Sequence, residues 1–323
     1  MIEEIPLDGD HQDFSRLETN DFDTQYGKIE SPTSQNNESI LDAILKTPED
    51  QLIPWEECAL PSNGLYYGWP DGVVKVRAMG QTAEKVLATQ RLAASGQSIE
   101  YLFRECVKFP DGFDPIDLLI GDRIYLLYYL RGITYGNLYE FAYTCPNADC
   151  SVISTHSYDL NELSNTVIPA KSEMGFEPFK VQLPYLSKVT ESDVYVGLRF
   201  LRAGDANEIL NKKKSLRNAN QARSSKKNPF ERKRKQDDLD ETITENLEKV
   251  IVHVMGSTDP SKIKAFVGKL HAQDTAIIRE WMKDNTPGID SSIELECPEC
   301  ATQFAIELPI TETFFRPAKQ RRV

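Results

Sequence analysis

The sequence predicts an α+β fold with a mainly helical body and short antiparallel strands, and three observations lead to this class. Several segments of the 323-residue chain repeat apolar residues at the spacing of a helix. Shorter segments alternate apolar and polar residues, as half-buried strands do. Two cysteine pairs, Cys145 with Cys150 and Cys297 with Cys300, each lie between two such alternating segments. These two distant cysteine hairpins predict a zinc-ribbon-like site within the fold.

The folded body is expected to begin near Trp55, with a strand and two helices. Residues 73–77 alternate as a strand, and a helix is expected over residues 83–94. Ser98 opens a second helix, in which Cys106 shares one face with Leu102 and Phe103. Because that face is apolar, we expect Cys106 to be a core residue.

A longer helix and a hairpin follow. Asp114 and Pro115 form a helix start, since proline suits the first helical position. A second helix is expected to start at Gly121 and to end at Gly132. Residues 138–144 and 152–155 then alternate on either side of the first cysteine pair, which predicts a hairpin with these cysteines at its tip.

The remaining segments are predicted to be helices and strands in no regular order. The sequence predicts a strand over residues 179–184, helices over 193–210 and 239–254, a helix opened by Asp259 and Pro260, and another capped by Asp274. On both sides of the second cysteine pair, apolar residues occupy every second position: Ile293 and Leu295 before it, and Phe304, Ile306 and Leu308 after it. A second cysteine hairpin is therefore expected.

Paired cysteines with two to four residues between them present soft ligands from a tight turn, and two such turns supply the four ligands of a tetrahedral zinc ion. Proline follows the first cysteine of each pair, at Pro146 and Pro298, and favours a turn because it fixes φ. Four thiolates leave no coordination position open, so the predicted metal is structural. The alternatives are disulfides or unrelated free thiols.

Two further observations bear on these alternatives. No run of about 18 apolar residues could span a membrane, and the start of the chain lacks the basic and apolar regions of a signal peptide. We therefore expect a reducing, intracellular setting, in which paired cysteines serve as metal ligands. A redox Cys-x-x-Cys pair begins a helix, whereas Cys297 to Cys300 precedes an alternating segment.

The net charge of −13 is concentrated in the first 50 residues, where thirteen acidic and three basic residues give −10. Within them, residues 39–45 form a short amphipathic turn that either docks on a partner or caps the body. Residues 1–38 are expected to be disordered when the protein is alone. We expect four segments: an acidic flexible arm (1–50), an α+β body with the first zinc knuckle (51–186), a helical insertion (187–290), and the second knuckle hairpin with a basic C-terminal tail (291–323).

Residues 212–235 form a basic linker with eleven Lys or Arg and one acid, Glu231. This linker is a solvated connector, a surface for phosphate groups or acidic proteins, or a partner for the acidic arm of a neighbouring copy. Nucleic-acid binding is not expected, because the rest of the chain is close to charge balance.

No arrangement of residues typical of an enzyme is present in the sequence. None of the four histidines has the spacing of a catalytic triad, and His253 is expected inside a helix. The sequence contains no glycine-rich phosphate loop and no His-Glu-x-x-His motif. We therefore expect neither catalysis nor a small-molecule substrate.

One stretch is more diagnostic than any single motif. Residues 121–131 read Gly-Asp-Arg-Ile-Tyr-Leu-Leu-Tyr-Tyr-Leu-Arg, and they lead through residues 134–139 to the segment 143–146. Together with residues 59–64 and 76–79, this stretch resembles the T4-type phage baseplate hub assembly proteins, which belong to contractile tails. The likeness covers residues 55–160 and extends more loosely to the second cysteine pair. The acidic arm and the basic linker lie outside the pattern, and the first knuckle has four intervening residues where two are commoner.

The resemblance implies a non-enzymatic role in building the baseplate, within the virion and, during assembly, in the host cytoplasm. The implied partners are other tail and baseplate subunits, in several copies, and the structural zinc would stabilise the fold. Two alternatives stay open: a zinc-ribbon nucleic-acid-binding regulator, and a tail-assembly chaperone absent from the mature particle. Within the stretch, Arg123 is expected to pair with Asp117 or Asp122 of the same chain.

Overall fold

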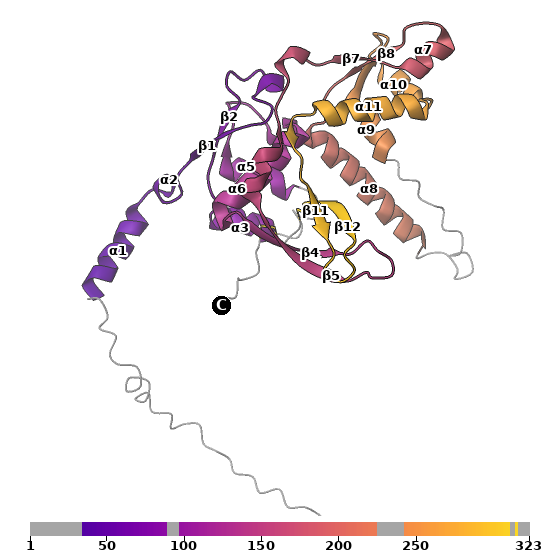
Figure 1. Cartoon of the computed structure of the whole chain (residues 1–323). Helices are drawn as coiled ribbons and strands as arrows, with labels where there is room; N and C mark the ends of the chain where they lie inside the picture. Colours follow the sequence, from indigo (N-terminus) through magenta and orange to yellow (C-terminus); the bar gives the residue numbers. More distant parts are fainter. Residues whose placement is uncertain (1–33, 89–96, 225–241, 311–313, 316–323) are drawn as a thin grey trace, which may run out of the picture. The chain divides into compact units, whose positions relative to one another are not determined.

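The structure is a computed structural model and describes residues 34–88, 97–224, 242–310 and 314–315 (Figure 1). The chain divides into two compact units, residues 1–52 and 53–323. The first contains α1 (Ser34–Lys46) and α2 (Glu49–Leu52). The amphipathic turn predicted at residues 39–45 lies within α1, which exposes its aliphatic side chains: Ile40, Leu41, Ile44 and Leu45. The disorder predicted for residues 1–38 is wrong for residues 34–38, which form the first part of α1, and residues 1–33 lie outside the described part.

The second unit begins with an antiparallel sheet in the order β1-β2-β3, with bounds Glu56–Ala59, Val73–Val76 and Val107–Lys108. Val74 and Val76 of β2 are buried, as the alternation predicted. Helices α3 (Gln81–Ala88) and α5 (Ser98–Cys106) lie between β2 and β3 in the sequence and contact each other. The second of these helices buries Cys106 as expected, whereas the predicted end of the first lies outside the described residues.

Helix α6 (Ile120–Tyr135) runs through the first core. The helix start predicted at Asp114 gives only a single 3₁₀ turn, η3 (Pro115–Asp117), in which the Asp114 carboxylate accepts from the N–H of Ile116. The predicted end at Gly132 is wrong, because α6 continues for three residues. It ends at Tyr135, and the next residue, Gly136, has a φ of 84° that suits glycine. Gly132 instead makes room for the side chain of Asn137, whose Oδ1 lies 2.5 Å from where a Cβ would be.

The two predicted hairpins are present. Strand β4 (Leu138–Thr144) pairs with β5 (Ile153–Asp159), and β11 (Ser292–Glu296) pairs with β12 (Gln303–Glu307). Each hairpin is a two-stranded antiparallel sheet with a cysteine pair in its connecting turn. Shorter elements complete this region: η2 (Leu65–Tyr67), η4 (Leu160–Thr166), η5 (Ser172–Met174), and the pair β6 (Val167–Ile168) and β10 (Gly288–Ile289).

A second antiparallel sheet has the order β7-β8-β9, with bounds Phe179–Gln182, Tyr195–Leu198 and Ile251–Val254. The helix predicted over residues 193–210 is therefore wrong in its first part, which forms the central strand. The helix predicted over 239–254 is wrong in its last part, which forms β9. The helices of this region are α7 (Pro184–Thr190), α8 (Ala203–Ser224), α9 (Thr242–Val250), α10 (Pro260–Val267) and α11 (Ala272–Asn285).

The helix caps in this region agree with the sequence in one case and differ in the other. Asp259 caps α10 as predicted, by accepting from the N–H of Ser261. Helix α11 is capped by His271 instead of Asp274. The Asp274 carboxylate is fully buried and accepts from two backbone N–H groups at the start of α7, those of Tyr185 and Leu186. Asp274 therefore accepts hydrogen bonds from α7, which is distant in the sequence, instead of capping its own helix.

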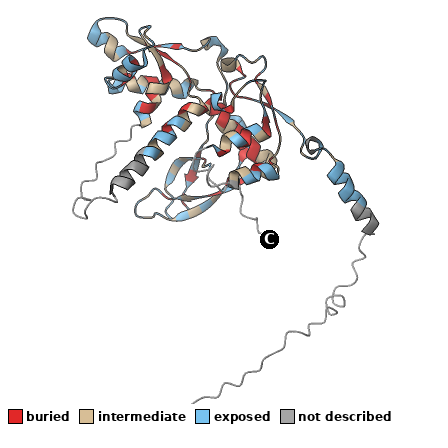
Figure 2. Cartoon of the chain, turned by 180° about the vertical axis from the view of Figure 1, so that it is seen from behind, coloured by how far each residue is buried: buried red, intermediate tan, exposed pale blue. Residues whose placement is uncertain are grey.

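The buried side chains of residues 53–323 form two main hydrophobic cores, and Figure 2 marks the buried residues in red. The first core combines residues between Cys58 and Leu163 with residues between Ile293 and Phe315. The second core lies between Val181 and Ile278. Helices and short antiparallel sheets occur in both regions, so the fold is α+β. The predicted four-segment division stays a prediction. Among the described residues, no helix is both long and apolar enough to cross a membrane.

Candidate metal centre

Four cysteines from the two hairpins meet at one point. Cys145 and Cys150 lie in the turn between β4 and β5, and Cys297 and Cys300 lie in the turn between β11 and β12. Their four sulfur atoms all lie within 4.8 Å of one another. The Sγ atoms of Cys145 and Cys300 are 3.6 Å apart, and those of Cys150 and Cys297 are 3.8 Å apart. Residues separated by 146 positions (151–296) are therefore brought together.

These distances fit a metal site better than disulfides. The two sulfurs of a disulfide are about 2.05 Å apart, so the four thiols are separate. Sulfurs that bind a tetrahedral ion at about 2.3 Å lie about 3.8 Å from one another. The separations of 3.6 Å and 3.8 Å in the two pairs match this value. Among the described residues, no other group of three or more His, Cys, Asp or Glu side chains gathers closely enough to hold a metal.

The two knuckles share one backbone arrangement despite their different lengths. The N–H of Cys145 donates to the carbonyl of Val152, and the N–H of Cys297 donates to the carbonyl of Thr302. The residue after the second cysteine has a positive φ in both, 46° at Ser151 and 54° at Ala301. This left-handed residue turns the chain back toward the strand and leaves both sulfurs on the inner side of the turn. The two additional residues of the first knuckle leave this arrangement unchanged.

Two polar side chains next to the sulfurs were not found from the sequence. The Nδ2 of Asn147 donates to the Sγ of Cys300 at 3.8 Å, and the Oγ1 of Thr302 lies 3.1 Å from the same sulfur. The hydroxyl and backbone N–H of Thr302 lower the pKa of Cys300 to about 6. Burial raises the pKa of Cys145 to about 12. Cys300 therefore forms the thiolate, the form that binds a metal, more readily than Cys145 does.

The base of each hairpin is fixed to α6 and to the C-terminal segment. The Tyr128 hydroxyl donates to the carbonyl of Leu308 at 2.7 Å, and the Tyr139 hydroxyl donates to that of Pro309 at 2.8 Å. The Phe314 ring packs edge-on against both tyrosine rings. These contacts hold the returning chain in place, so that the cysteine turns meet at the other end of the hairpins.

A buried carboxylate lies at the start of α6. Asp122 is fully buried, and its two oxygens accept from the N–H of Ser62 at 3.0 Å and from the hydroxyl of Tyr67 at 2.6 Å. Burial raises the pKa of Asp122, although these hydrogen bonds oppose the shift. Since Tyr67 also accepts from the N–H of Leu119, the three groups connect residues 59–67 to α6. The sequence pointed to this region only through the family resemblance, which includes both residues 59–64 and residues 121–131.

The other residues singled out from the sequence have structural roles. Arg123 pairs with Glu100 at 3.1 Å, so its predicted pairing with Asp117 or Asp122 is wrong, although the partner does belong to the same chain. Cys106 is buried in the first core, as is Cys58, the other cysteine outside the cluster. His253 lies in β9, not in a helix, and its ring covers Gly197 of the neighbouring strand.

Comparison with known families gives one match. The model of the T4 bacteriophage base plate protein family matches residues 56–316. No curated protein and no solved structure matches the chain. The matched region contains both hairpins, both hydrophobic cores and all four cysteines of the cluster. Because the match covers most of the sequence, the chain belongs to the T4 bacteriophage base plate protein family.

Proposed function

We propose that this protein is a structural component of a contractile phage tail baseplate, in which a zinc ion bound by four cysteines stabilises the fold. The family supports a structural or assembly role in the tail, with other phage tail proteins as partners. The finer parts of the proposal are a place in the baseplate hub, several copies per particle, a permanent position in the virion after assembly in the host cytoplasm, and a non-enzymatic role.

The observation that carries the zinc assignment is the mutual approach of the four sulfurs. Two hairpins present two thiols each, at separations typical of a tetrahedral thiolate site. Thiolates favour zinc over the harder cations that oxygen ligands select. Once four thiolates bind the ion, no position is left for a substrate, which supports a structural, zinc-ribbon-like role.

The charge of the hairpins favours assembly over nucleic-acid regulation. Residues 138–159 and 292–307 contain seven acidic residues and no Lys or Arg: Glu140, Asp149, Asp159, Glu294, Glu296, Glu299 and Glu307. A zinc ribbon that binds a phosphate backbone requires basic side chains near the knuckles. The acidic hairpins would be repelled by nucleic acid.

Mass spectrometry of purified virions tests the proposed place in the particle. We expect the chain at a fixed ratio to the major tail proteins, and we expect it to remain after high-salt washing. Its absence from virions, together with its presence in lysates of infected cells, would instead identify a tail-assembly chaperone. Elemental analysis of the purified chain tests the metal separately, with one zinc per chain expected.

A further inference from the structure

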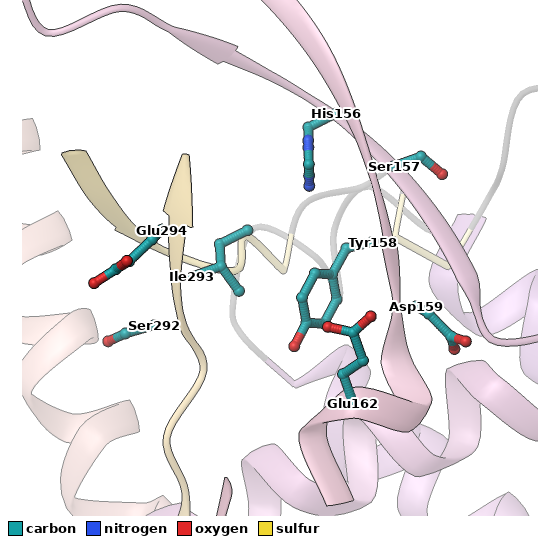
Figure 3. A pocket seen from close by; sticks show the side chains of 8 residues that line it. All are labelled: His156, Ser157, Tyr158, Asp159, Glu162, Ser292, Ile293 and Glu294. Carbon is teal, nitrogen blue, oxygen red and sulfur yellow. The ribbon is translucent and has the colours of Figure 1, made fainter. Parts of the chain in front are cut away.

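A cleft between the two cysteine hairpins offers little apolar surface to a partner. It has a volume of about 470 Å³ and is lined by residues 156–159 of β5, by Glu162, and by residues 292–294 of β11 (Figure 3). Ile293 is the one aliphatic side chain among these lining residues, and it is 6% exposed. In Figure 3 it points toward the side chains of β5. A surface with several exposed aliphatic side chains lies elsewhere in the chain, on α1.

Helix α1 has one aliphatic face, formed by four residues: Ile40, Leu41, Ile44 and Leu45. Residues three or four positions apart in a helix are neighbours on its surface, so these side chains form one continuous stripe. They are between 48% and 74% exposed. Polar residues occupy the opposite side, where Asp42 and Lys46 form an exposed ion pair at 3.9 Å. Exposed aliphatic residues that gather on one face, unlike those scattered singly, mark an interaction site.

The length of α1 also indicates a partner. The helix has 13 residues, and isolated helices shorter than about 12–15 residues are marginal in water. Its first four residues, Ser-Gln-Asn-Asn, are mostly weak helix formers. Because local propensity alone does not stabilise such a helix, contacts of its aliphatic face with another surface must contribute.

The aliphatic face lies outside the part of the chain that the family model matches. That match covers residues 56–316, and both hydrophobic cores are built from residues 58–315. Helix α1 ends at Lys46, before the match begins. The region that the family model describes therefore forms its cores without α1, which favours a partner outside the chain.

The charge of this segment selects the chemistry of the partner. Residues 38–50 contain four acidic residues and one basic residue, a net charge of −3, and the first 50 residues together carry −10. A second copy of this segment would bring the same negative charge, and the anionic surface of a membrane would repel it in the same way. A groove with apolar side chains at its floor and Lys or Arg at its rim is complementary in both respects.

We propose that α1 binds through its aliphatic face in an apolar groove flanked by Lys or Arg on another protein of the phage tail. The inference rests on the proposed function, since it takes the partner from the same particle. The aliphatic residues enter the groove, the polar side of the helix stays in water, and the acidic residues around the helix pair with the basic rim. The helix then attaches the family fold to its neighbour.

Incorporation into virions tests the aliphatic face. Ile44→Glu with Leu45→Glu, in the full-length chain, places two charges in that face. We expect an about tenfold lower amount of this variant in purified virions, because a charge opposes burial in an apolar groove, and mass spectrometry against the major tail proteins measures it. The matched control, Ser39→Glu with Ala43→Glu, adds the same two charges at exposed positions on the other side of α1, and we expect it at the wild-type amount. Equal amounts of the two variants would overturn the proposal.

Photo-crosslinking in infected cells identifies the partner. Benzoyl-phenylalanine replaces Leu45, which is 74% exposed, or Asp42 on the polar side as the control. From position 45 we expect crosslinks to one tail protein, at a segment that combines apolar residues with Lys or Arg, and about tenfold fewer from position 42. Crosslinks within the chain or to a second copy, equal yields from both positions, or none from either would overturn the proposal. A wild-type chain that is absent from virions but forms the crosslink from position 45 would contradict the proposed permanent place in the particle and still support the docking surface.

Discussion

The two hydrophobic cores of residues 53–323 are assembled from the chain in different ways. The second core lies within one stretch of about a hundred residues, and its sheet and helices pack without any nearby cysteine cluster. The first core combines two segments separated by that whole stretch, and its later part contributes few buried residues, among them Ile293, Leu295 and Phe314. Long loops cost entropy to close, and a short returning segment buries little apolar area in return. The cysteine cluster lies in the turns of the two hairpins that these separate segments supply.

The largest expected effect tests whether the first core depends on the metal. We expect Cys297→Ser to remove zinc and to lower the free energy of unfolding of the first core by about 5 kcal/mol or more, because the binding free energy of a structural metal contributes directly to folding. Tryptophan fluorescence can follow each core separately, since Trp69 packs on the first and Trp281 on the second. Urea unfolding measures the two effects in Trp55→Phe backgrounds that also carry Trp281→Phe or Trp69→Phe, because Trp55, which lies against Arg77 and Lys108, would otherwise add its own signal.

Cys106→Ala is the matched control for this variant. It truncates a fully buried cysteine of the same core outside the cluster. We expect it to cost about 1–2 kcal/mol and to leave the zinc content at one per chain. Retention of zinc by Cys297→Ser, with an unchanged unfolding midpoint, would show that the first core closes without the metal and would remove the contrast between the cores.

The second prediction concerns the point where the chain returns from the second core to the first. Gly121 of α6 contacts the turn at Pro287 and Gly288, and a Cβ at Gly121 would lie 1.8 Å from the carbonyl oxygen of Pro287. This oxygen belongs to the backbone and cannot move alone. We therefore expect Gly121→Ala to destabilise the protein by about 3 kcal/mol, measured by urea unfolding. Gly268→Ala is the control: a Cβ there meets nothing closer than 3.7 Å and the backbone is right-handed helical, so we expect a stabilisation of about 0.4–1 kcal/mol. Equal effects would mean that the close approach is unimportant.

The difference between the cores also explains what could be predicted from the sequence. The hairpins and their cysteines were predicted because both signals are local: strand alternation and the spacing of ligands within one turn. That the two turns meet followed from the chemistry of a four-thiolate site. Asn147 and Thr302 could not be predicted as neighbours of Cys300, because contacts between two hairpins depend on how they pack, and no pattern in either knuckle specifies this.

Most of the wrong predictions concern the second core, whose strands pair with partners distant in the sequence. Residues 195–198 carry apolar positions that also fit a helix, and their identity as a central strand depends on partners at residues 179–182 and 251–254. Residues 250–254 did carry a usable signal, since a run of β-branched residues favours a strand. The ion pair of Arg123 was misassigned for a similar reason. Glu100 lies on another helix, whereas the expected partners were close in sequence.

The third prediction compares a buried ion pair, Arg123 with Glu100, with an exposed one. The side chains of Arg123 and Glu100 are 10% and 13% exposed, and Asn207 of α8 donates to the same carboxylate. Arg123→Met keeps much of the volume but leaves a buried charge without its partner, so we expect a loss of about 3 kcal/mol. Arg104→Met is the control, since its pair with Asp114 is about half exposed and is expected to contribute below about 1 kcal/mol. Similar unfolding midpoints for both variants would contradict the role of burial.

The smallest expected effect is a pH dependence at the edge of the second core. Asp205 is held by Arg199 at 2.7 Å and accepts from the N–H of Arg202. Burial opposes ionisation, but these interactions outweigh it and lower the pKa of Asp205. A carboxyl whose pKa is depressed on folding stabilises the protein above its unfolded pKa of about 3.9, and this contribution is lost as pH falls through the lower folded value. We therefore expect Asp205→Asn to cost about 1–2 kcal/mol at neutral pH, with the difference from wild type shrinking below about pH 4. Urea unfolding between pH 3 and pH 7 measures it, on a background with both Trp55→Phe and Trp69→Phe so that Trp281 reports. A difference that is the same at every pH would mean that Asp205→Asn acts only through the changed shape of the side chain. The charge of Asp205 would then contribute nothing to the stability of the second core.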